Sequence, residues 1–229
     1  MAADAGPGDP GHKGDIILWA DAHLCIVDKP AGLLCVPGRG EDKQDCLSAR
    51  LQALDAAARV VHRLDMVTSG LVVFARSAEA QRRLSDAFAR RAVDKRYEAV
   101  VQGCPVADGG DTDGWHTIDL PLAADWPRRP LQKVDPVHGR PSRTRWRSLG
   151  HDAAADRSRL LLAPETGRTH QLRVHLQALG HPICGDALYG LAVAAQAPAD
   201  PRLLLHATRL DFAHPITGAP LTFDSPAPF

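Results

Sequence analysis

The chain has 229 residues, of which 45% are hydrophobic, so it can bury a sizeable core within one domain of ordinary size. Lys plus Arg and Asp plus Glu both number 27, and this zero net charge excludes nucleic-acid binding through bulk positive charge alone. No apolar run approaches the roughly 18 residues that cross a bilayer. Residues 1–10 have neither the basic region nor the apolar stretch of a signal peptide. We therefore expect a cytoplasmic protein with no membrane contact.

The cysteines agree with this location. They are odd in number and widely spaced, with no Cys-x-x-Cys pair: Cys25, Cys35, Cys46, Cys104 and Cys184. The pattern is typical of reduced, mostly structural thiols and not of a disulfide framework or a zinc knuckle. A disulfide between two of them is the less favoured alternative.

The predicted elements mix strands and helices. Residues 1–14 are rich in Gly and Pro and predict a disordered tail, which leaves residues 15–229 as a single domain. Apolar runs predict strands at residues 16–19, 24–27, 70–75, 97–101, 160–163, 203–206 and 221–223. Helical spacing predicts three helices: one through Leu47, Leu51 and Leu54, one capped by Ser77, and one over 170–179 that Gly180 ends.

Residues 103–114 and 121–142 are rich in Gly, Pro and Asp and predict long loops. Because strands and helices do not alternate strictly, we expect an α+β fold and not a doubly wound one. Its core would be a mixed, largely antiparallel β-sheet with flanking helices.

The zero net charge conceals an uneven distribution. Residues 1–28 carry a balance of −4, whereas residues 82–96 carry +4 and residues 126–149 carry +6. A single basic run is often only a solvated surface. Two such runs in a neutral chain favour a side of the molecule that faces a polyanion.

The most distinctive local feature is the stretch from Val60 to Gly70, in which His62, Arg63 and Asp65 separate two apolar strands. Loops between strands of a rigid scaffold are where catalytic groups usually lie. Local chemistry alone favours an ordinary turn, in which the Asp65 carboxylate accepts hydrogen bonds from the residues that follow it.

The segment from Glu165 to His175 predicts a helix capped by Thr166 or Thr169. Arg168 in its first turn opposes the helix dipole, which is reasonable if a carboxylate or phosphate lies opposite. A third segment, Lys95 to Val101, reads as a strand that carries Tyr97.

Taken together, these three segments resemble the RluA family of RNA pseudouridine synthases. The resemblance rests on His62-Arg63-Leu64-Asp65-x-x-Thr68-Ser69-Gly70, on Arg96-Tyr97 and on Gly167-Arg168-Thr169-His170-Gln171-Leu172-Arg173-Val174-His175. Further matching stretches lie at residues 28–33, 179–190, 204–207 and 214–215, so the resemblance covers about residues 15–229. It implies the pseudouridine synthase fold with a central active-site cleft, and it outweighs the turn interpretation of Asp65.

The resemblance also implies the reaction. A pseudouridine synthase breaks the N1–C1′ bond of a uridine, turns the base and rejoins it through C5. Asp65 would be the essential carboxylate, either as a nucleophile or as a base that removes a sugar proton. Arg168 would pair with Asp65, and Tyr97 would stack on the uracil and assist deprotonation of C5. Because the reaction is an isomerisation, we expect no cofactor and no metal.

The implied partner is structured RNA, whose target uridine must leave its stack to reach Asp65. We expect RNA contacts from His62, Arg63, Thr68 and Ser69 beside Asp65, and from Arg143 and Arg145 in the second basic run. Residues 125–133 and 223–229 are similar to family members that act on both a large-subunit rRNA stem-loop and a tRNA anticodon arm. Relatives often carry an N-terminal S4 domain. We expect none here, and a monomer without a protein partner.

Two other interpretations come from different classes. A non-catalytic RNA-binding protein that kept the fold would be expected to have lost Asp65, Tyr97 or Arg168, and all three are present. A metal hydrolase would use His170, His175 and His181, but the spacing of the first two is five and not that of a helical zinc site.

Overall fold

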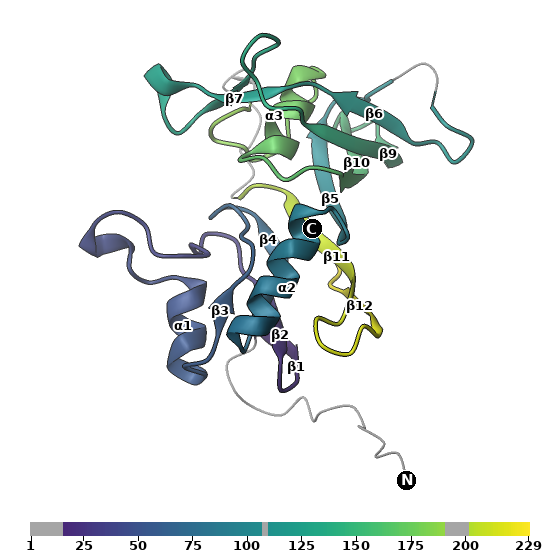
Figure 1. Ribbon diagram of the computed structural model, residues 1–229. Helices are drawn as coiled ribbons and strands as arrows, with labels where there is room; N and C mark the ends of the chain where they lie inside the picture. Colours follow the sequence, from purple (N-terminus) through teal and green to yellow (C-terminus); the bar gives the residue numbers. More distant parts are fainter. Residues whose placement is uncertain (1–15, 107–109, 191–201) are drawn as a thin grey trace.

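The computed structural model describes residues 16–106, 110–190 and 202–229 (Figure 1). The expected tail at residues 1–14 lies outside this part of the chain. One large sheet contains strands in the order β1-β2-β4-β11-β5-β10-β9-β6, with β3 paired to β4 and β12 paired to β11. The strands are β1 (Ile17–Ala20), β2 (Leu24–Lys29), β3 (Arg59–Val60), β4 (Ser69–Ala75), β5 (Asp94–Gln102), β6 (His116–Asp119), β9 (Arg143–Asp152), β10 (Arg157–Pro164), β11 (Leu205–Ala213) and β12 (Pro220–Asp224).

Three α-helices flank this sheet among the described residues: α1 (Leu47–Leu54), α2 (Ala78–Ala89) and α3 (Gln171–Ala178). In Figure 1, α1 and α2 lie with β1 to β4 in one half of the molecule, and α3 lies with β6 to β10 in the other. Strands β5 and β11 run between the halves. The prediction of an α+β fold with a largely antiparallel sheet is confirmed.

The two halves of the sheet meet at β4 and β11, which form the one parallel pair of the described sheet. Gly70 lies opposite Ala207 in this pair. A Cβ at Gly70 would fall 2.4 Å from the Ala207 carbonyl oxygen, and the φ of Gly70 is +110°. Only glycine tolerates both the close approach and this backbone conformation.

The first half forms because its apolar residues pack on both faces of β2 and β4, whose side chains are almost all buried. Helix α2 begins where expected, since the Ser77 hydroxyl accepts a hydrogen bond from the backbone N–H of Ala80 at 3.1 Å. Ala80 and Leu84 then pack against β4 on one side of the helix. Helix α1 places Leu47 and Leu51 on the opposite face of the sheet.

In the second half, α3 packs on the face of the sheet formed by β5, β10 and β9. Leu172 and Leu176 of the helix contact Leu162 and Trp146 of the strands in one buried cluster. The cap predicted for this helix is wrong. Its N-cap is His170, in the left-handed conformation and without a side-chain cap bond. The Thr166 hydroxyl instead donates to the amide oxygen of Gln171 at 2.7 Å.

One predicted loop also needs correction. Residues 121–142 contain a small two-stranded sheet of β7 (Leu122–Ala124) and β8 (Gln132–Val134). Leu122 and Val134 pack with Val174 of α3, so this hairpin covers the outer side of the helix. Because most positions of the segment are Gly, Pro or polar, its three-residue strands leave no periodic signal in the sequence.

Candidate active site

Asp65 lies in the loop between β3 and β4. A buried lysine, Lys29, holds the backbone of this loop through a hydrogen bond. The Lys29 ammonium donates to the carbonyls of Leu33, Pro30 and Met66 at 2.8, 2.9 and 3.0 Å. These three bonds use all of its donors. Burial lowers the pKa of Lys29 to about 8, so the ammonium form still predominates at neutral pH. Lys29 therefore holds the residue that directly follows Asp65.

The Asp65 carboxylate points into a pocket between the two halves of the molecule. Its Oδ2 lies 3.5 Å from Nη1 of Arg173 and 3.9 Å from Nε2 of His170. The loop itself closes through the backbone, because the N–H of Thr68 donates to the Asp65 carbonyl at 3.1 Å. The carboxylate is thus directed at a cation on α3 and not at its own turn. The turn interpretation of Asp65 is wrong.

The pocket has a volume of about 120 Å³. Most of its polar groups are cationic or can move a proton, and the Asp65 carboxylate, 28% exposed, is the one acidic side chain in its lining. The polar lining side chains are Arg63, Asp65, Thr68, Lys95, Tyr97, Thr166, Arg168, His170, Gln171 and Arg173. The expected cleft around Asp65 is therefore present, and side chains from both halves form it.

Arg173 is anchored from behind. Asp186 accepts two parallel hydrogen bonds from its guanidinium, both at 2.7 Å, and the side chains of Arg173 and Asp186 are 3% and 0% exposed. Burial acts to lower the pKa of Arg173, but the bonds and charge of Asp186 and the charge of Asp65 raise it overall. The Nε and Nη2 atoms on one edge of the guanidinium thus bind Asp186, and Nη1 remains available to Asp65.

His170 is the second group on α3 that faces Asp65. Its backbone has φ of 54°, which is uncommon for a residue other than glycine. The Nδ1 atom bonds to the Tyr189 hydroxyl at 2.7 Å, which orients Nε2 toward the carboxylate. Burial lowers the pKa of His170, so the ring is neutral near pH 7. Strained residues of this kind occur preferentially at functional sites.

Tyr97 lines the pocket from β5. Its ring packs against the core clusters on both sides of the pocket, so its position is fixed by the sheet. Burial, followed by the charge of Asp65, raises the pKa of Tyr97. The hydroxyl is therefore protonated at neutral pH and available as a donor.

The expected pair between Arg168 and Asp65 requires correction. Arg168 lines the pocket, but its Nε and Nη2 atoms both donate to the Pro141 carbonyl at 3.3 Å. Arg173 occupies the position beside Asp65, and the sequence analysis missed it. A signal was present, because Arg173 lies inside an apolar helical run, where a buried charge needs a partner.

Asp186, Tyr189 and His170 were also missed. They lie far from Asp65 in sequence. The packing of α3 against the loop that follows it places His170 in the pocket, with Asp186 and Tyr189 bound to the far side of Arg173 and His170.

The six expected RNA contacts fall into separate places. Arg63 is exposed and lines the pocket, and Thr68 lines it as a buried side chain. Arg143 and Arg145 lie in a neighbouring groove, described below. Ser69 is buried, and its hydroxyl bonds to Nδ1 of His206 at 2.8 Å. The Ser69 hydroxyl thus already has a partner within the fold, and its contact with RNA stays a prediction.

His62 has a structural position as well. Its ring stacks on Phe88 with centroids 4.4 Å apart, and its Nε2 accepts the backbone N–H of Val73 at 3.1 Å. Desolvation lowers the pKa of His62 to about 3. A neutral ring in these contacts offers no charge to a phosphate, and His62 does not line the Asp65 pocket.

The three histidines of the metal-hydrolase interpretation are held by different partners. His175 bonds to Thr144 and to the Leu120 carbonyl, and His181 bonds to the Gln102 carbonyl. Within the described ranges, no group of three metal-ligating side chains is brought together. In the same residues, no helix is long and apolar enough to cross a membrane.

A family model described as RNA pseudouridylate synthase matches residues 23–178. The chain belongs to this family, and it is an enzyme that isomerises uridine to pseudouridine in RNA. The dual-specificity RNA pseudouridine synthase RluA of Escherichia coli strain K12 is 46% identical over 214 residues, which cover 93% of this chain and 94% of that protein. RluA of Haemophilus influenzae is 41% identical over 213 residues and 93% of each chain.

Solved structures agree with this assignment. Human RNA pseudouridylate synthase domain containing 1 aligns with a TM-score of 0.75 at 29% identity, covering 97% of this chain and 87% of that one. Human RNA pseudouridylate synthase domain containing 4 shares the fold, with a TM-score of 0.73 at 24% identity.

Proposed function

We propose that Asp65 is the essential carboxylate of the isomerisation, and that it acts on a uridine bound between the two halves of the molecule. The supporting observation is its place in a pocket where a fixed guanidinium, a tyrosine and a neutral histidine surround it. Arg173 places a cation 3.5 Å from the Asp65 carboxylate and keeps this carboxylate directed into the pocket. Either attack as a nucleophile or removal of a sugar proton requires the ionised form.

Tyr97 has the second role in this proposal. Its ring packs against the core clusters on both sides, and the residue lines the pocket. A uracil stacked on the ring would place C5 near the Tyr97 hydroxyl, which would relay the proton that leaves C5 by giving its own proton to water as it accepts the one from C5. Arg168 contributes positive charge at the rim, where the phosphates of the bound strand would lie.

Base flipping completes the scheme. The target uridine must unstack at a cost of a few kcal/mol before it can reach Asp65. Arg63 is exposed and separated from Asp65 by one residue, so its guanidinium would occupy the space that the flipped base leaves. Thr68 would contact the nucleotide from the floor of the pocket.

The substrates in this proposal are of two kinds, a stem-loop of large-subunit rRNA and a tRNA anticodon arm. Support comes from the two RluA relatives, whose name states dual specificity and which align with nearly the whole chain. We further propose that the enzyme is a cytoplasmic monomer whose residues 15–229 form one catalytic domain, and that it needs neither a cofactor nor a metal. Light scattering of the purified protein at micromolar concentration tests the monomer.

The test of the function maps pseudouridines in total RNA from cells with and without this gene. Loss of sites in both an rRNA stem-loop and a tRNA anticodon arm supports dual specificity, and loss in one class alone limits the substrate to that class. In a tritium-release assay on uridine-labelled RNA, Asp65→Asn should fold normally and make no pseudouridine. Residual turnover near that of the parent would remove Asp65 from its assigned role.

A further inference from the structure

Three arginines surround one indole outside the Asp65 pocket. Trp115 directly precedes β6 and is half-buried. The guanidinium carbons of Arg145, Arg147 and Arg96 lie 5.0, 5.2 and 5.6 Å from its ring centroid. We call Trp115 and these three arginines the Trp115 cluster. Cation–π contacts are worth about 0.5–1 kcal/mol each at exposed sites, and they hold the guanidiniums in place without neutralising them.

The strand register explains this gathering of charge. Arg145 and Arg147 are two residues apart on β9, so both point to the same face of the sheet. Trp146, between them, points to the other face and packs with α3 in the core. Arg96 precedes Tyr97 on β5 and points away from the catalytic pocket for the same reason. The cluster therefore lies on the face opposite α3.

The charges of the cluster are only partly matched by acids. Arg145 pairs with Asp111 at 2.6 Å. Arg147 has no such partner among the described residues, and its buried Nε lacks any hydrogen bond there. A buried donor without an acceptor costs about 1–3 kcal/mol. What favours an anion beside the cluster is the positive charge of Arg147, with which no acid of the described residues forms an ion pair.

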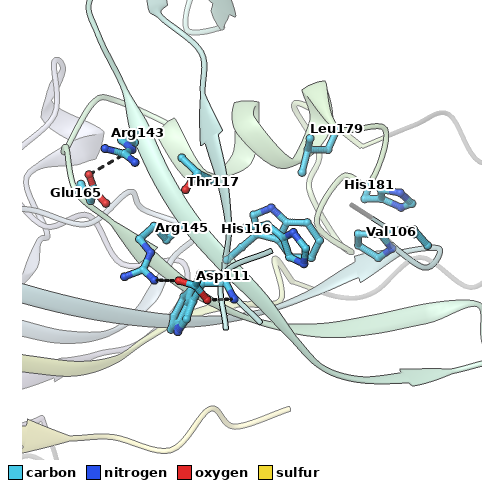
Figure 2. Close-up of a pocket in the computed structure, with 12 residues that line it drawn as sticks. Val106, Asp111, His116, Thr117, Arg143, Arg145, Glu165, Leu179 and His181 are labelled. Atoms are coloured by element: carbon cyan, nitrogen blue, oxygen red, sulfur yellow. Dashed lines mark hydrogen bonds and ion pairs between the residues drawn. The ribbon is translucent and has the colours of Figure 1, made fainter. Parts of the chain in front are cut away.

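A groove of about 700 Å³ opens beside the cluster. Figure 2 shows Arg143 paired with Glu165 and Arg145 paired with Asp111 toward one end, and His181 toward the other. Both ion pairs lie at the surface, where each is worth about 1 kcal/mol or less, so a phosphate could replace the carboxylates at small cost.

The groove continues to the catalytic pocket. A hollow of about 270 Å³ shares Arg145 and Glu165 with the groove, and it shares Lys95 and Pro164 with the Asp65 pocket. This hollow is also lined by Arg91 and Arg96. From β5 to β6 the path crosses three strand spacings, or about 14 Å. A strand of RNA that leaves the pocket would thus meet Lys95, Arg91, Arg96 and Arg145 along this path, together with the carboxylates of Asp94 and Glu165.

We propose that the Trp115 cluster and its groove form a second RNA-binding surface, which holds the sugar–phosphate backbone of nucleotides that flank the target uridine. The inference rests on the proposed function, because it takes the Asp65 pocket as the place of that uridine. Guanidiniums with open donors match phosphate oxygens, and an aromatic ring within a basic groove is typical of sites for single-stranded nucleic acid. Trp115 keeps the arginines together and offers its ring to a base.

Binding is measured in the Asp65→Asn background, so that the result does not depend on turnover. An RNA stem-loop with the target uridine and its flanking nucleotides is titrated over a range of NaCl concentrations. Arg147→Gln and Arg145→Gln should each weaken binding roughly tenfold, as expected for one lost charge-assisted hydrogen bond. Each should make the plot of log affinity against log salt shallower by about 0.7. Trp115→Ala should weaken binding, and Trp115→Phe should restore most of it.

Arg50→Gln is the matched control, because Arg50 lies on α1 in the other half and pairs with Asp45 at the surface. In the active enzyme, the cluster variants should raise KM on the full stem-loop. A short RNA that ends beside the target uridine should remove the difference between variant and parent. Thermal melting confirms that each variant is folded.

If folded Arg147→Gln and Arg145→Gln proteins keep the affinity and the salt slope of the parent, the proposal that this surface binds RNA is wrong. An equal loss of RNA affinity in Arg50→Gln would also contradict the proposal, because the loss would then follow from the change in net charge and not from the cluster. Failure of the proposed function gives a different result, in which the cluster variants still bind RNA more weakly but the parent enzyme makes no pseudouridine.

Discussion

The guanidinium of Arg173 lies 3.5 Å from the carboxylate of Asp65, although the two residues are 108 positions apart in the chain. The same guanidinium binds the fully buried Asp186 through two shorter bonds. Arg173 therefore links the core of one half of the molecule to the catalytic loop of the other. A change at this residue should affect both stability and turnover, and the two effects can be separated.

Arg173→Met should lower the free energy of unfolding by about 3–5 kcal/mol, because Asp186 then remains buried without a partner. The double variant Arg173→Met with Asp186→Leu should regain most of this stability and still lack turnover, since Asp65 has no guanidinium. Denaturant unfolding and tritium release measure the two effects. Arg168→Met serves as the comparison. It should have the stability of the parent and lose less activity than Arg173→Met. A total loss in Arg168→Met beside an active double variant would reverse the assignment.

Tyr97→Phe should fold like the parent, because the ring keeps its contacts with both core clusters. If the hydroxyl moves the C5 proton, kcat should fall by about 10²-fold or more, the usual contribution of general acid–base catalysis. Single-turnover kinetics with saturating enzyme measure this step. Tyr97→Leu should lose the stacking surface as well and bind the RNA more weakly. A parental rate in Tyr97→Phe would limit Tyr97 to stacking.

Lys29→Met should destabilise the protein by about 1–3 kcal/mol, because the buried carbonyl of Leu33 and the partly buried carbonyls of Pro30 and Met66 lose their donor. It should also lower kcat, since the Met66 carbonyl no longer holds the backbone beside Asp65. Chemical denaturation and turnover at a temperature where the variant is folded test the two parts. Lys43→Met, at an exposed position, should change neither.

The protein should lose stability as the pH falls below about 6.5. His62, His170 and His175 all have a pKa lowered by burial, and that of His62 falls to about 3. The unfolded chain then binds protons first, which favours unfolding between pH 6.5 and the lower pKa of each folded group. Each histidine contributes a slope of up to about 1.4 kcal/mol per pH unit. Between about pH 7 and 8 these histidines are neutral in both states, and their contribution to the pH dependence should vanish.

His62→Gln isolates one part of this slope. Its amide oxygen can accept the N–H of Val73, which His62 accepts in the parent, but it does not titrate. Urea unfolding from pH 7.5 to 4.5 should give a shallower decline for the variant. An identical decline would show that His62 carries none of the pH dependence.

The elements with strong periodicity could be predicted from the sequence. The strand at Gly70, the Ser77 cap and the helix through Leu172 lie where the apolar pattern and local chemistry place them. Sequence patterns could not predict the short strands β7 and β8 or the His170 cap. Packing against α3 and around the pocket determines these features, and local sequence preference does not.

The site was predictable only in part for the same reason. Asp65 and Tyr97 belong to short motifs, so their place in the pocket could be expected. The choice between Arg168 and Arg173 depends on which side of α3 faces the sheet, and both occur in the same motif. The Trp115 cluster could not be foreseen, because it needs the register of β5, β9 and β6, which sequence spacing does not contain.

Strand β11 lies in the middle of the sheet, between β4 and β5, yet among the described residues it follows every other strand of that sheet except β12. The strands that carry or adjoin Asp65 and Tyr97 therefore leave the ribosome with facing edges unpaired. A nascent or truncated chain that stops before residue 205 has no strand to join its two halves. It should be catalytically silent and prone to aggregate. Activity should therefore require the chain from residue 205 onward, although the Asp65 motif is made about 140 residues earlier.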